Sequence, residues 1–307
     1  MKRSFLSAVW FFVGLLPTIS GAVPSARTSR PIPAIEHVLI VIVDGLRPDL
    51  ALVADMPALR SLMQGGAYSF WARTTDVAIT LPSCTSILTG VKPSKHGVDW
   101  NRDLLGKQIY PAVPTVFEMA SQAGYVTAMV AGKSKFAALT KPNSVAHVFL
   151  PAASKCSDEQ VAAEAEKMIE SFTPGLMCVH FPDVDTVGHA RGWGSPEQIV
   201  QLTRTDAQLA RVLAALDRAG IRNSTFVLLT ADHGGAGRTH GGEDPRSRHI
   251  PWIVSGPGVR KAYDLTQQAS RVINTEDSCA TVCWVLGLPQ AAYFDGKPVL
   301  EAFERVP

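Results

Sequence analysis

The chain has 307 residues, 46% of them hydrophobic and 18% charged, which is enough for one large globular domain with a substantial core. Its formal net charge at pH 7 is only +2, from 29 Lys and Arg against 27 Asp and Glu, and the sequence contains no basic run. This charge balance argues against a nucleic-acid polymer as a binding partner.

The N-terminus has the pattern of a secretory signal. Residues 1–3 are a short positive start, an apolar run follows from Phe5 to Ile19, and Ser20-Gly-Ala22 offers the small residues that a signal peptidase needs. A membrane anchor is the alternative, but the run is shorter than the roughly 20 residues of a spanning helix. We therefore expect residues 1–22 to be a cleaved signal peptide and the mature protein to be secreted or periplasmic, without a stable membrane anchor. Its removal leaves 27 basic and 27 acidic side chains, because the segment holds two basic residues and no acid.

The rest of the chain alternates between strand and helix patterns. A Pro-rich leader at 23–34 is expected to be extended. In chain order, the patterns of the remaining segment, 35–307, predict strand 37–43, helices 56–64, 82–88 and 114–122, strand 125–130, helix 157–170, strand 176–181, helix 196–219, strands 226–229 and 250–254, and helix 275–286. This alternation predicts a single α/β domain, with a mainly parallel β-sheet sandwiched between helices.

Seven residues with metal-ligand chemistry stand mostly at the ends of these apolar runs. They are Asp44, Thr80, Asp185, His189, Asp232, His233 and His240. The carboxyl ends of parallel strands meet at one edge of a sheet, where open α/β sheets bind ligands. Each Asp or His alone would be interpreted as an ordinary cap or turn residue. Together they predict a divalent-metal site, and carboxylate-imidazole groups at two places favour two ions over one.

Thr80 has two interpretations from local sequence. It precedes Leu-Pro-Ser at the expected start of a helix, where a threonine most often serves as the N-cap. It could instead be a nucleophile whose hydroxyl is ionised by a metal, and the helix N-terminus would stabilise the resulting anion. Local sequence favours the cap.

Six motifs occur in an order that resembles the alkaline phosphatase superfamily, closest to its type I phosphodiesterase/nucleotide pyrophosphatase branch. They are Val43-Asp-Gly-Leu-Arg-Pro48, Thr80-Leu-Pro-Ser-Cys-Thr-Ser-Ile-Leu-Thr-Gly90, His96-Gly-Val-Asp-Trp-Asn101, Asp185-Thr-Val-Gly-His189, Ala231-Asp-His-Gly-Gly235 and Thr239-His-Gly-Gly242. Six ordered motifs are specific, whereas Asp-His-Gly alone would be weak. The resemblance covers about residues 37–260 and implies the alkaline phosphatase-like fold.

The resemblance also implies a mechanism in which two zinc ions bridge the phosphoryl group of a small phosphorylated substrate. Asp185, His189 and His240 would bind one zinc ion, and Asp44, Asp232, His233 and the Thr80 hydroxyl would bind the other. Thr80 would accept the phosphoryl group as the nucleophile, Asn101 would donate a hydrogen bond to it, and water would hydrolyse the phosphothreonine. Sites of this type also accept manganese or iron.

Three departures from the family pattern bear on the substrate. His233 and His240 are only seven residues apart, without the long insertion of the larger phosphodiesterases, so 35–307 resembles a catalytic domain with a minimal cap. Ser83-Cys84 stands where those enzymes often have Asn-His. Lys133 and Lys135 follow strand 125–130, and a similar pair marks the monoesterase and phosphonoacetate-hydrolase branches. Extra cations suit a monoester, which has more anionic oxygens than a diester. A solvated surface turn is the other interpretation of the lysines.

Several alternatives remain open at this level. The function is that of a phosphodiesterase-like or phosphomonoesterase-like hydrolase, or of a phosphonoacetate hydrolase. A sulfatase is disfavoured because Thr80-Leu-Pro-Ser-Cys84 lacks the Cys/Ser-x-Pro-x-Arg pattern. The signal peptide argues against a cytosolic mutase, and the complete ligand set argues against a non-catalytic binding protein. Oligomeric state and disulfide pairing are not indicated. Five other residues are weaker candidates: Asp183 as a ligand, His249 near the site, Trp100 and Trp193 as pocket walls, and His180 as a hydrogen-bonded core residue.

Overall fold

A computed structural model describes residues 29–104, 109–267 and 271–304. The expected signal peptide at 1–22 lies outside the described residues, as does the first part of the leader. The described end of the leader is bent and not extended, because the Ile35 N–H donates to the Ile32 carbonyl at 3.0 Å and closes a turn. Among the described residues, no helix has the length and apolar character needed to cross a bilayer.

One eight-stranded sheet forms the centre of the fold, in the order β4-β3-β5-β1-β6-β7-β2-β8. The strands are β1 (His37–Val43), β2 (Gly66–Arg73), β3 (Thr127–Ala131), β4 (His147–Phe149), β5 (Leu176–Phe181), β6 (Thr225–Thr230), β7 (His249–Ser255) and β8 (Tyr263–Asp264). Within this sheet β7 is antiparallel to both of its neighbours, and the other described pairings are parallel. The mainly parallel sheet predicted from the sequence is confirmed.

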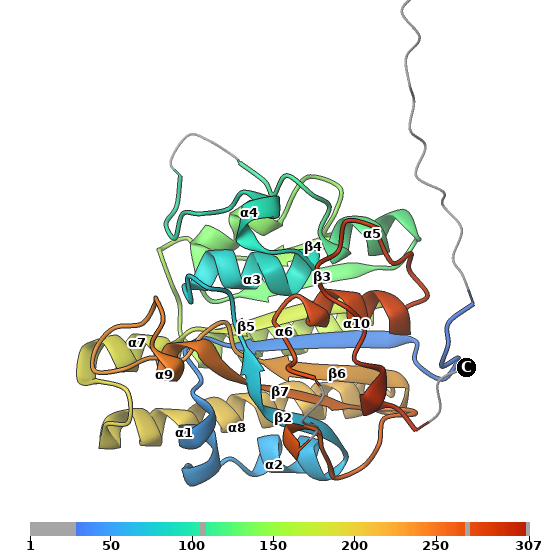
Figure 1. Cartoon of the computed structure of the whole chain (residues 1–307). Helices are drawn as coiled ribbons and strands as arrows, with labels where there is room; N and C mark the ends of the chain where they lie inside the picture. The colour runs from blue at the N-terminus through green and yellow to red at the C-terminus, as the bar shows by residue number, and fades with distance from the viewer. Residues whose placement is uncertain (1–28, 105–108, 268–270, 305–307) are drawn as a thin grey trace, which may run out of the picture.

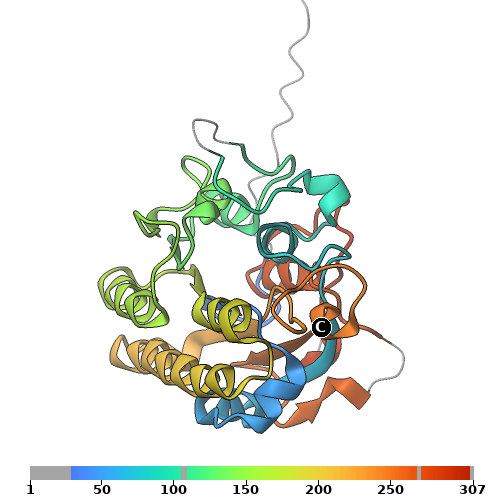
Figure 2. The same cartoon turned by 90° about the vertical axis from the view of Figure 1, so that its left-hand side faces the viewer.

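Helices cover both faces of this sheet (Figures 1 and 2). The α-helices are α1 (Pro48–Val53), α2 (Pro57–Gln64), α3 (Thr80–Thr89), α4 (Pro93–His96), α5 (Val116–Gln122), α6 (Asp158–Phe172), α7 (Asp183–Arg191), α8 (Pro196–Arg218), α9 (Pro245–Arg248) and α10 (Asp277–Val285). Short 3-10 helices are η1 (Ser134–Leu139), η2 (Arg222–Ser224), η3 (Leu265–Gln267) and η4 (Leu300–Ala302). One helical layer contains α2, α6 and α8, and the other contains α3, α5 and α10.

The central strands explain where the polar residues go. Every residue of β5 and β6 is buried, and β1 is buried beyond its first residue, because helices cover both faces. Such strands carry no polar face, so the chain places the Asp residues of the site where the strands end, whereas His180 lies within β5. Asp44 directly follows β1, α7 begins just after β5, and Asp232 follows β6.

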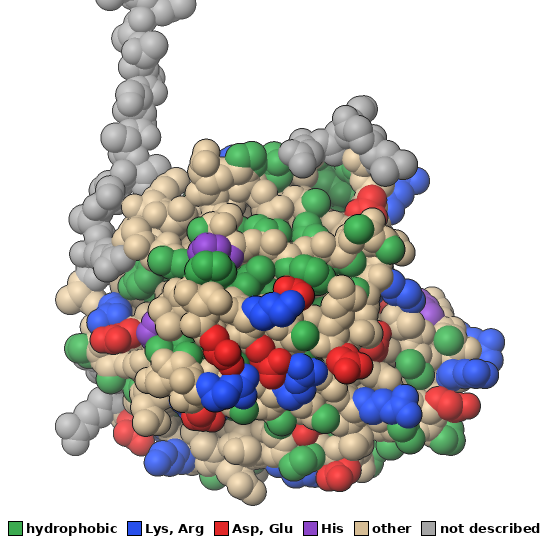
Figure 3. All heavy atoms as spheres, turned by 180° about the vertical axis from the view of Figure 1, so that it is seen from behind, with side chains coloured by type: hydrophobic (Ala, Val, Ile, Leu, Met, Phe, Trp, Pro, Cys, Tyr) green, Lys and Arg blue, Asp and Glu red, His purple; other side chains and the backbone are tan. Residues whose placement is uncertain are grey.

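The outer surface carries charges of both signs. On the face opposite to that of Figure 1, acidic and basic side chains are interspersed (Figure 3). Between α6 and α8, Arg211 pairs with Glu166 at 2.6 Å and Arg218 with Glu170 at 2.6 Å. Ion pairs at the surface, such as the exposed Arg218–Glu170 pair, contribute little stability, and this mixed surface agrees with the near-zero net charge.

A buried carboxylate joins α8 to the start of α2. Asp206 accepts hydrogen bonds from the Ala58 and Leu59 N–H groups at 2.8 and 2.9 Å, and the N-cap residue Met56 supplies no side-chain bond. We expect Asp206→Ala to lower the free energy of unfolding by about 1–3 kcal/mol, because two buried N–H groups lose their acceptor. Chemical denaturation measures the change. Asp217→Ala, an exposed change on the same helix, is the control, and equal effects of both variants would contradict this role.

Candidate metal centre and active site

Three groups of described Asp, His and Cys side chains could hold a metal ion, and the first contains Asp185, His189 and His240. Asp185 and His189 lie one turn apart on α7, as their spacing predicts. Asp185 Oδ1 lies 3.3 Å from His189 Nε2 and 3.6 Å from His240 Nε2. The ligand atoms of the three residues lie within 4.8 Å of one another, which is compatible with a single metal ion.

The second cluster contains Asp44, Asp232 and His233, with Thr80 beside it. His233 Nε2 lies 3.5 Å from Asp44 Oδ1, 3.3 Å from Asp232 Oδ2 and 3.3 Å from Thr80 Oγ1. The His233 ring stacks on His240 at a centroid distance of 3.6 Å, so the two clusters are adjacent. The structure thus brings together all seven residues that the sequence singled out.

The backbone turn after β1 fits this second cluster closely. Gly45 adopts a left-handed conformation at φ +76°, and its N–H donates to Asp232 Oδ1 at 3.1 Å. A Cβ atom at this position would lie 3.1 Å from Asp185 and 3.2 Å from Trp193. Glycine therefore allows the strand end to turn within the site.

Each of the three imidazole rings directs Nδ1 to a backbone carbonyl and Nε2 to the carboxylates. Nδ1 of His189, His233 and His240 lies 2.9–3.0 Å from a backbone carbonyl, which can only accept, so each neutral ring carries its proton on Nδ1. Nε2 then presents a lone pair to the carboxylates. Burial lowers the pKa of His233, and it lowers that of His240 to about 4, so both rings are neutral at pH 7. This is the state in which imidazole binds a metal.

Three buried carboxylate oxygens without hydrogen-bond partners are further positions at which a cation could bind. Asp44 Oδ1, Asp185 Oδ1 and Asp232 Oδ2 are buried and accept no hydrogen bond. Burial raises the pKa of Asp232, and the charge of Asp44 raises it further. Burial acts the same way on Asp44, but Lys133 and His180 outweigh it and hold its pKa well below the ordinary value. Carboxylates this close together in a dry site require positive charge between them.

Lys133 supplies part of that charge. It lies just after β3, and its Nζ is 2.7 Å from both Asp44 Oδ2 and Asp185 Oδ2, which belong to different clusters. Lys135 extends beside it and donates to Asn101 Oδ1 at 2.7 Å. Both lysines therefore reach the site, in contrast to the surface-turn interpretation.

Asn101 is fixed at the start of α3. Its Oδ1 also accepts from the Leu81 N–H at 3.0 Å, which leaves its NH2 group as the available donor. Thr80 is the first residue of α3, and the N-cap position belongs to Ile79. The helix begins two residues earlier than predicted, so Thr80 does not act as its cap. Its hydroxyl instead faces His233.

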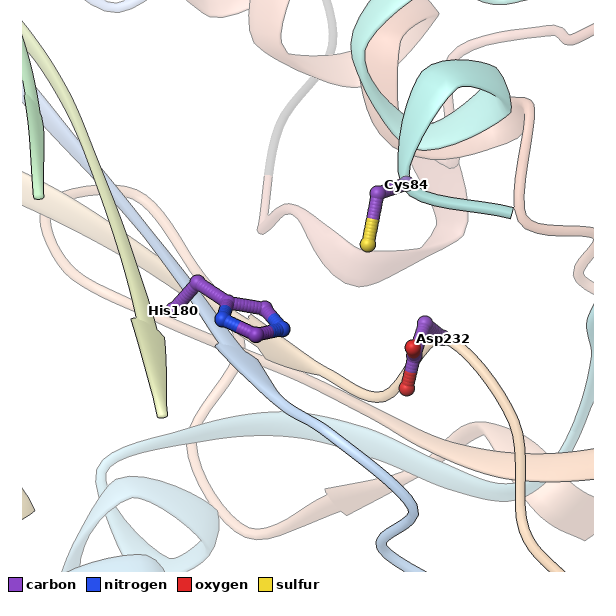
Figure 4. A group of neighbouring side chains, drawn as sticks. All are labelled: Cys84, His180 and Asp232. Carbon is purple, nitrogen blue, oxygen red and sulfur yellow. The ribbon is translucent and has the colours of Figure 1, made fainter. Parts of the chain in front are cut away.

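His180 contributes to the site from within β5. The residue is fully buried, and its Nε2 lies 3.0 Å from Asp44 Oδ2, so the ring orients that carboxylate. Figure 4 shows the ring near the Asp232 carboxylate, with Cys84 projecting from α3. Burial, followed by the charges of Asp232 and Asp44, raises the pKa of the Cys84 thiol well above its ordinary value. The sequence predicted a hydrogen-bonded core histidine, but the identity of its partner depends on the pairing of β5 with β1.

Other weaker candidates lie outside the clusters. Asp183 accepts a hydrogen bond from the Asp158 N–H at 2.9 Å and does not face the metal ligands. His249 stacks on Trp71 at 3.8 Å. Trp193 is buried, donates from Nε1 to the Gly45 carbonyl at 2.9 Å and contacts His189 and His240 edge-on. All five cysteines are free thiols.

A cavity of about 400 Å³ opens onto the first cluster. Asp185 and His189 form part of its lining, together with four cationic side chains: Arg102, Lys133, Lys135 and Lys155. Sequence reasoning did not single out Arg102 and Lys155. Arg102 is adjacent to Asn101 in the sequence, which could have indicated it, whereas Lys155 reaches the cavity through the fold alone.

Known proteins with related sequences belong to families that hydrolyse or transfer phosphoryl or sulfuryl groups, as their names state. The sequence profile of the type I phosphodiesterase/nucleotide pyrophosphatase family matches residues 38–241, and a sulfatase profile matches residues 198–288. The catalytic subunit of human GPI ethanolamine phosphate transferase 2 is 25% identical over 286 residues, which cover 89% of this chain and 28% of that protein. The chain spans less than half the length of the curated relatives it matches.

Solved structures share the fold. Murine ectonucleotide pyrophosphatase/phosphodiesterase 5, in an inactive threonine-to-alanine form with AMP, aligns with a TM-score of 0.71 at 16% identity, over 87% of this chain and 100% of that chain. A phosphonate monoester hydrolase from Silicibacter pomeroyi aligns with a TM-score of 0.63 at 17% identity, over 89% of this chain and 77% of that chain. Because the family profile matches more than half of the sequence, this chain belongs to the type I phosphodiesterase/nucleotide pyrophosphatase family, within the alkaline phosphatase superfamily.

Proposed function

We propose that the protein is an exported, metal-dependent phosphoric-ester hydrolase that forms a phosphothreonine on Thr80. The observation that carries the proposal is the pair of adjacent Asp/His clusters, with three imidazole Nε2 atoms held toward three unsatisfied carboxylate oxygens. Export rests on the signal pattern at 1–22.

The donor sets fit two divalent ions, and zinc is the metal proposed here. Asp185, His189 and His240 would hold one ion, and Asp44, Asp232, His233 and the Thr80 hydroxyl would hold the other. When bound, the metals neutralise phosphoryl charge and lower the pKa of coordinated hydroxyl groups. Nitrogen and carboxylate donors of this kind suit zinc, and manganese or iron are alternatives.

The chain's own residues divide the reaction into two displacements. Thr80 Oγ loses its proton and attacks phosphorus, the new Oγ–P bond forms, and the bond from phosphorus to the alcohol oxygen breaks. The departing alcohol takes up a proton. A water molecule loses a proton as its oxygen attacks the same phosphorus, the Oγ–P bond breaks, Thr80 Oγ takes up a proton, and phosphate is released. The position of Thr80 at the N-terminus of α3 favours its anionic form.

Asn101, Lys133 and Lys135 provide groups for the remaining phosphoryl oxygens. The free NH2 group of Asn101 can donate to one oxygen, and Lys135 lies 2.7 Å from Asn101 Oδ1, close enough to serve the same group. Lys133 already neutralises two carboxylates. These cations favour a phosphomonoester, or a phosphonate as second candidate, over a diester with fewer ionisable oxygens.

We expect Lys135→Ala and Lys133→Ala to lower kcat/KM for p-nitrophenyl phosphate about tenfold to a hundredfold, because a charged hydrogen bond is worth roughly 1.5–3 kcal/mol. Hydrolysis of bis-p-nitrophenyl phosphate should fall much less. The ratio of the two losses, measured by steady-state kinetics, identifies the substrate class.

Metal content must be measured on the same samples, because Lys133 contacts carboxylates of both clusters. Lys141→Ala is the matched control, since Lys141 pairs with Glu118 on the surface at 2.7 Å. Small, equal losses on both substrates would favour a phosphodiesterase, and the absence of turnover on either ester by the metal-loaded protein would refute the proposed hydrolase.

A further inference from the structure

Two adjoining cavities form a groove that begins at the metal ligands. The site cavity, of about 400 Å³, is lined by Asp185 and His189 among others. The outer cavity has a volume of about 770 Å³. Four residues line both cavities: Arg102, Asp103, Lys135 and Ser154. A ligand held at the metal ligands can therefore extend past these shared residues into the outer cavity.

The two cavities differ in chemistry. The site cavity has four cationic side chains against two carboxylates in its lining, so it suits an anionic group. Beyond the shared residues, the outer cavity is lined chiefly by apolar side chains, among them Trp100, Ala138, Leu150, Pro151 and Ala153. Its volume lies within the range of about 300–1,000 Å³ that is usual for small-molecule pockets.

Hydrogen bonds fix the outer cavity relative to the site. Ser134 Oγ donates to Asp103 Oδ2 at 2.8 Å, and the Ser134 N–H donates to the Ser154 carbonyl at 3.0 Å. Trp100 precedes Asn101, which is held by Leu81 and Lys135. The apolar wall is thus attached by hydrogen bonds to the residues that surround the proposed phosphoryl position.

We propose that the outer cavity binds the apolar alkyl or aryl group of a phosphoric ester whose phosphoryl group occupies the site cavity. The inference rests on the proposed function and names its substrate class. Apolar groups gain free energy by leaving water for this wall. Against the apolar part of the wall, the hydroxyl groups of a sugar would find fewer hydrogen-bond partners than in water, which is costly.

A series of n-alkylphosphonates, from methyl to octyl, tests the inference on the zinc-loaded protein. The head group stays constant along the series, so differences in Kd report the alkyl chain alone. Calorimetry should give a Kd that falls about two- to fourfold for each added methylene until the cavity is filled. Ala153→Trp places a bulky side chain in the space that the alkyl group would occupy, and Leu150→Asn removes apolar wall surface, so each should flatten this dependence while methylphosphonate binding is retained. Ala210→Trp, an exposed change on α8, is the matched control.

A Kd that does not change with chain length in the unmodified protein would overturn the inference. The same holds if Ala153→Trp and Leu150→Asn leave the chain-length dependence as steep as in Ala210→Trp. Binding is read without turnover, so the two proposals can fail separately. A steep dependence in a protein that hydrolyses no phosphoric ester would support the apolar subsite and refute the hydrolase.

Discussion

Replacing Thr80 with alanine is expected to lower kcat for phosphoric-ester hydrolysis by several orders of magnitude. The change removes the oxygen atom that attacks phosphorus, so no residual contact can replace its role. Thr80 is buried at the start of α3, and its Oγ1 lies 3.3 Å from His233 Nε2. Steady-state kinetics on p-nitrophenyl phosphate with metal-loaded protein measures the loss.

The Thr80→Ser variant distinguishes a nucleophilic role of Thr80 from a helix-stabilising one. Serine keeps the hydroxyl and should retain part of the rate, and rapid quenching of that variant or of the unmodified protein should trap phosphate on the side chain. If Thr80 only stabilised the helix start, Thr80→Ala would cost about 0.5–2 kcal/mol of stability and leave the rate intact. That outcome would reject the phosphothreonine mechanism.

His240→Ala should remove metal from the first cluster and most of the activity with it. Two ligands, Asp185 and His189, would remain of three. Changes to groups that merely orient a ligand cost about 10- to 100-fold in metal affinity, and the loss of a direct ligand should exceed that range. Equilibrium dialysis followed by elemental analysis should find one tightly bound ion per chain instead of two.

His147→Ala is the matched control, since His147 lies on the edge strand β4, away from both clusters, and stacks on Phe172 at the end of α6. It should retain both ions and full activity. Two retained ions in His240→Ala would show that His240 is not a ligand, and would leave its Nε2 near Asp185 without a metal-binding role.

The elements that the sequence predicted well are those whose signals are local. The bounds of β1 and β5 coincide with the predicted strands 37–43 and 176–181, because each is a largely apolar run with clear ends, Glu36 and Asp44 for β1 and Gly175 and Pro182 for β5. Ser157 caps α6 by accepting from the Gln160 N–H at 3.3 Å, a bond between residues three apart.

β2 was not predicted from the sequence. Its residues, 66–73, begin with glycine and lack a continuous apolar run, and the strand forms by antiparallel pairing with β7, far along the chain. Strand pairing of this kind depends on partners that are distant in the sequence, so local patterns do not indicate it. The same holds for the direction of β7, which alone among the paired strands runs opposite to its neighbours.

The sequence by itself indicated the seven candidate ligands, although not the cavity residues Arg102 and Lys155. Asp44 and Asp232 stand just beyond strands that are covered on both faces, and this placement can be read from the order of residue types. Tertiary structure decided how these residues meet. The pairing of β1 with β5 and β6 brings Asp44, Asp185 and Asp232 together, and the carboxylate charges attract the Lys133 ammonium between them. Tertiary structure also forms the apolar outer cavity. The wall of this cavity joins segments around residues 100, 138 and 150, which share no pattern in the sequence.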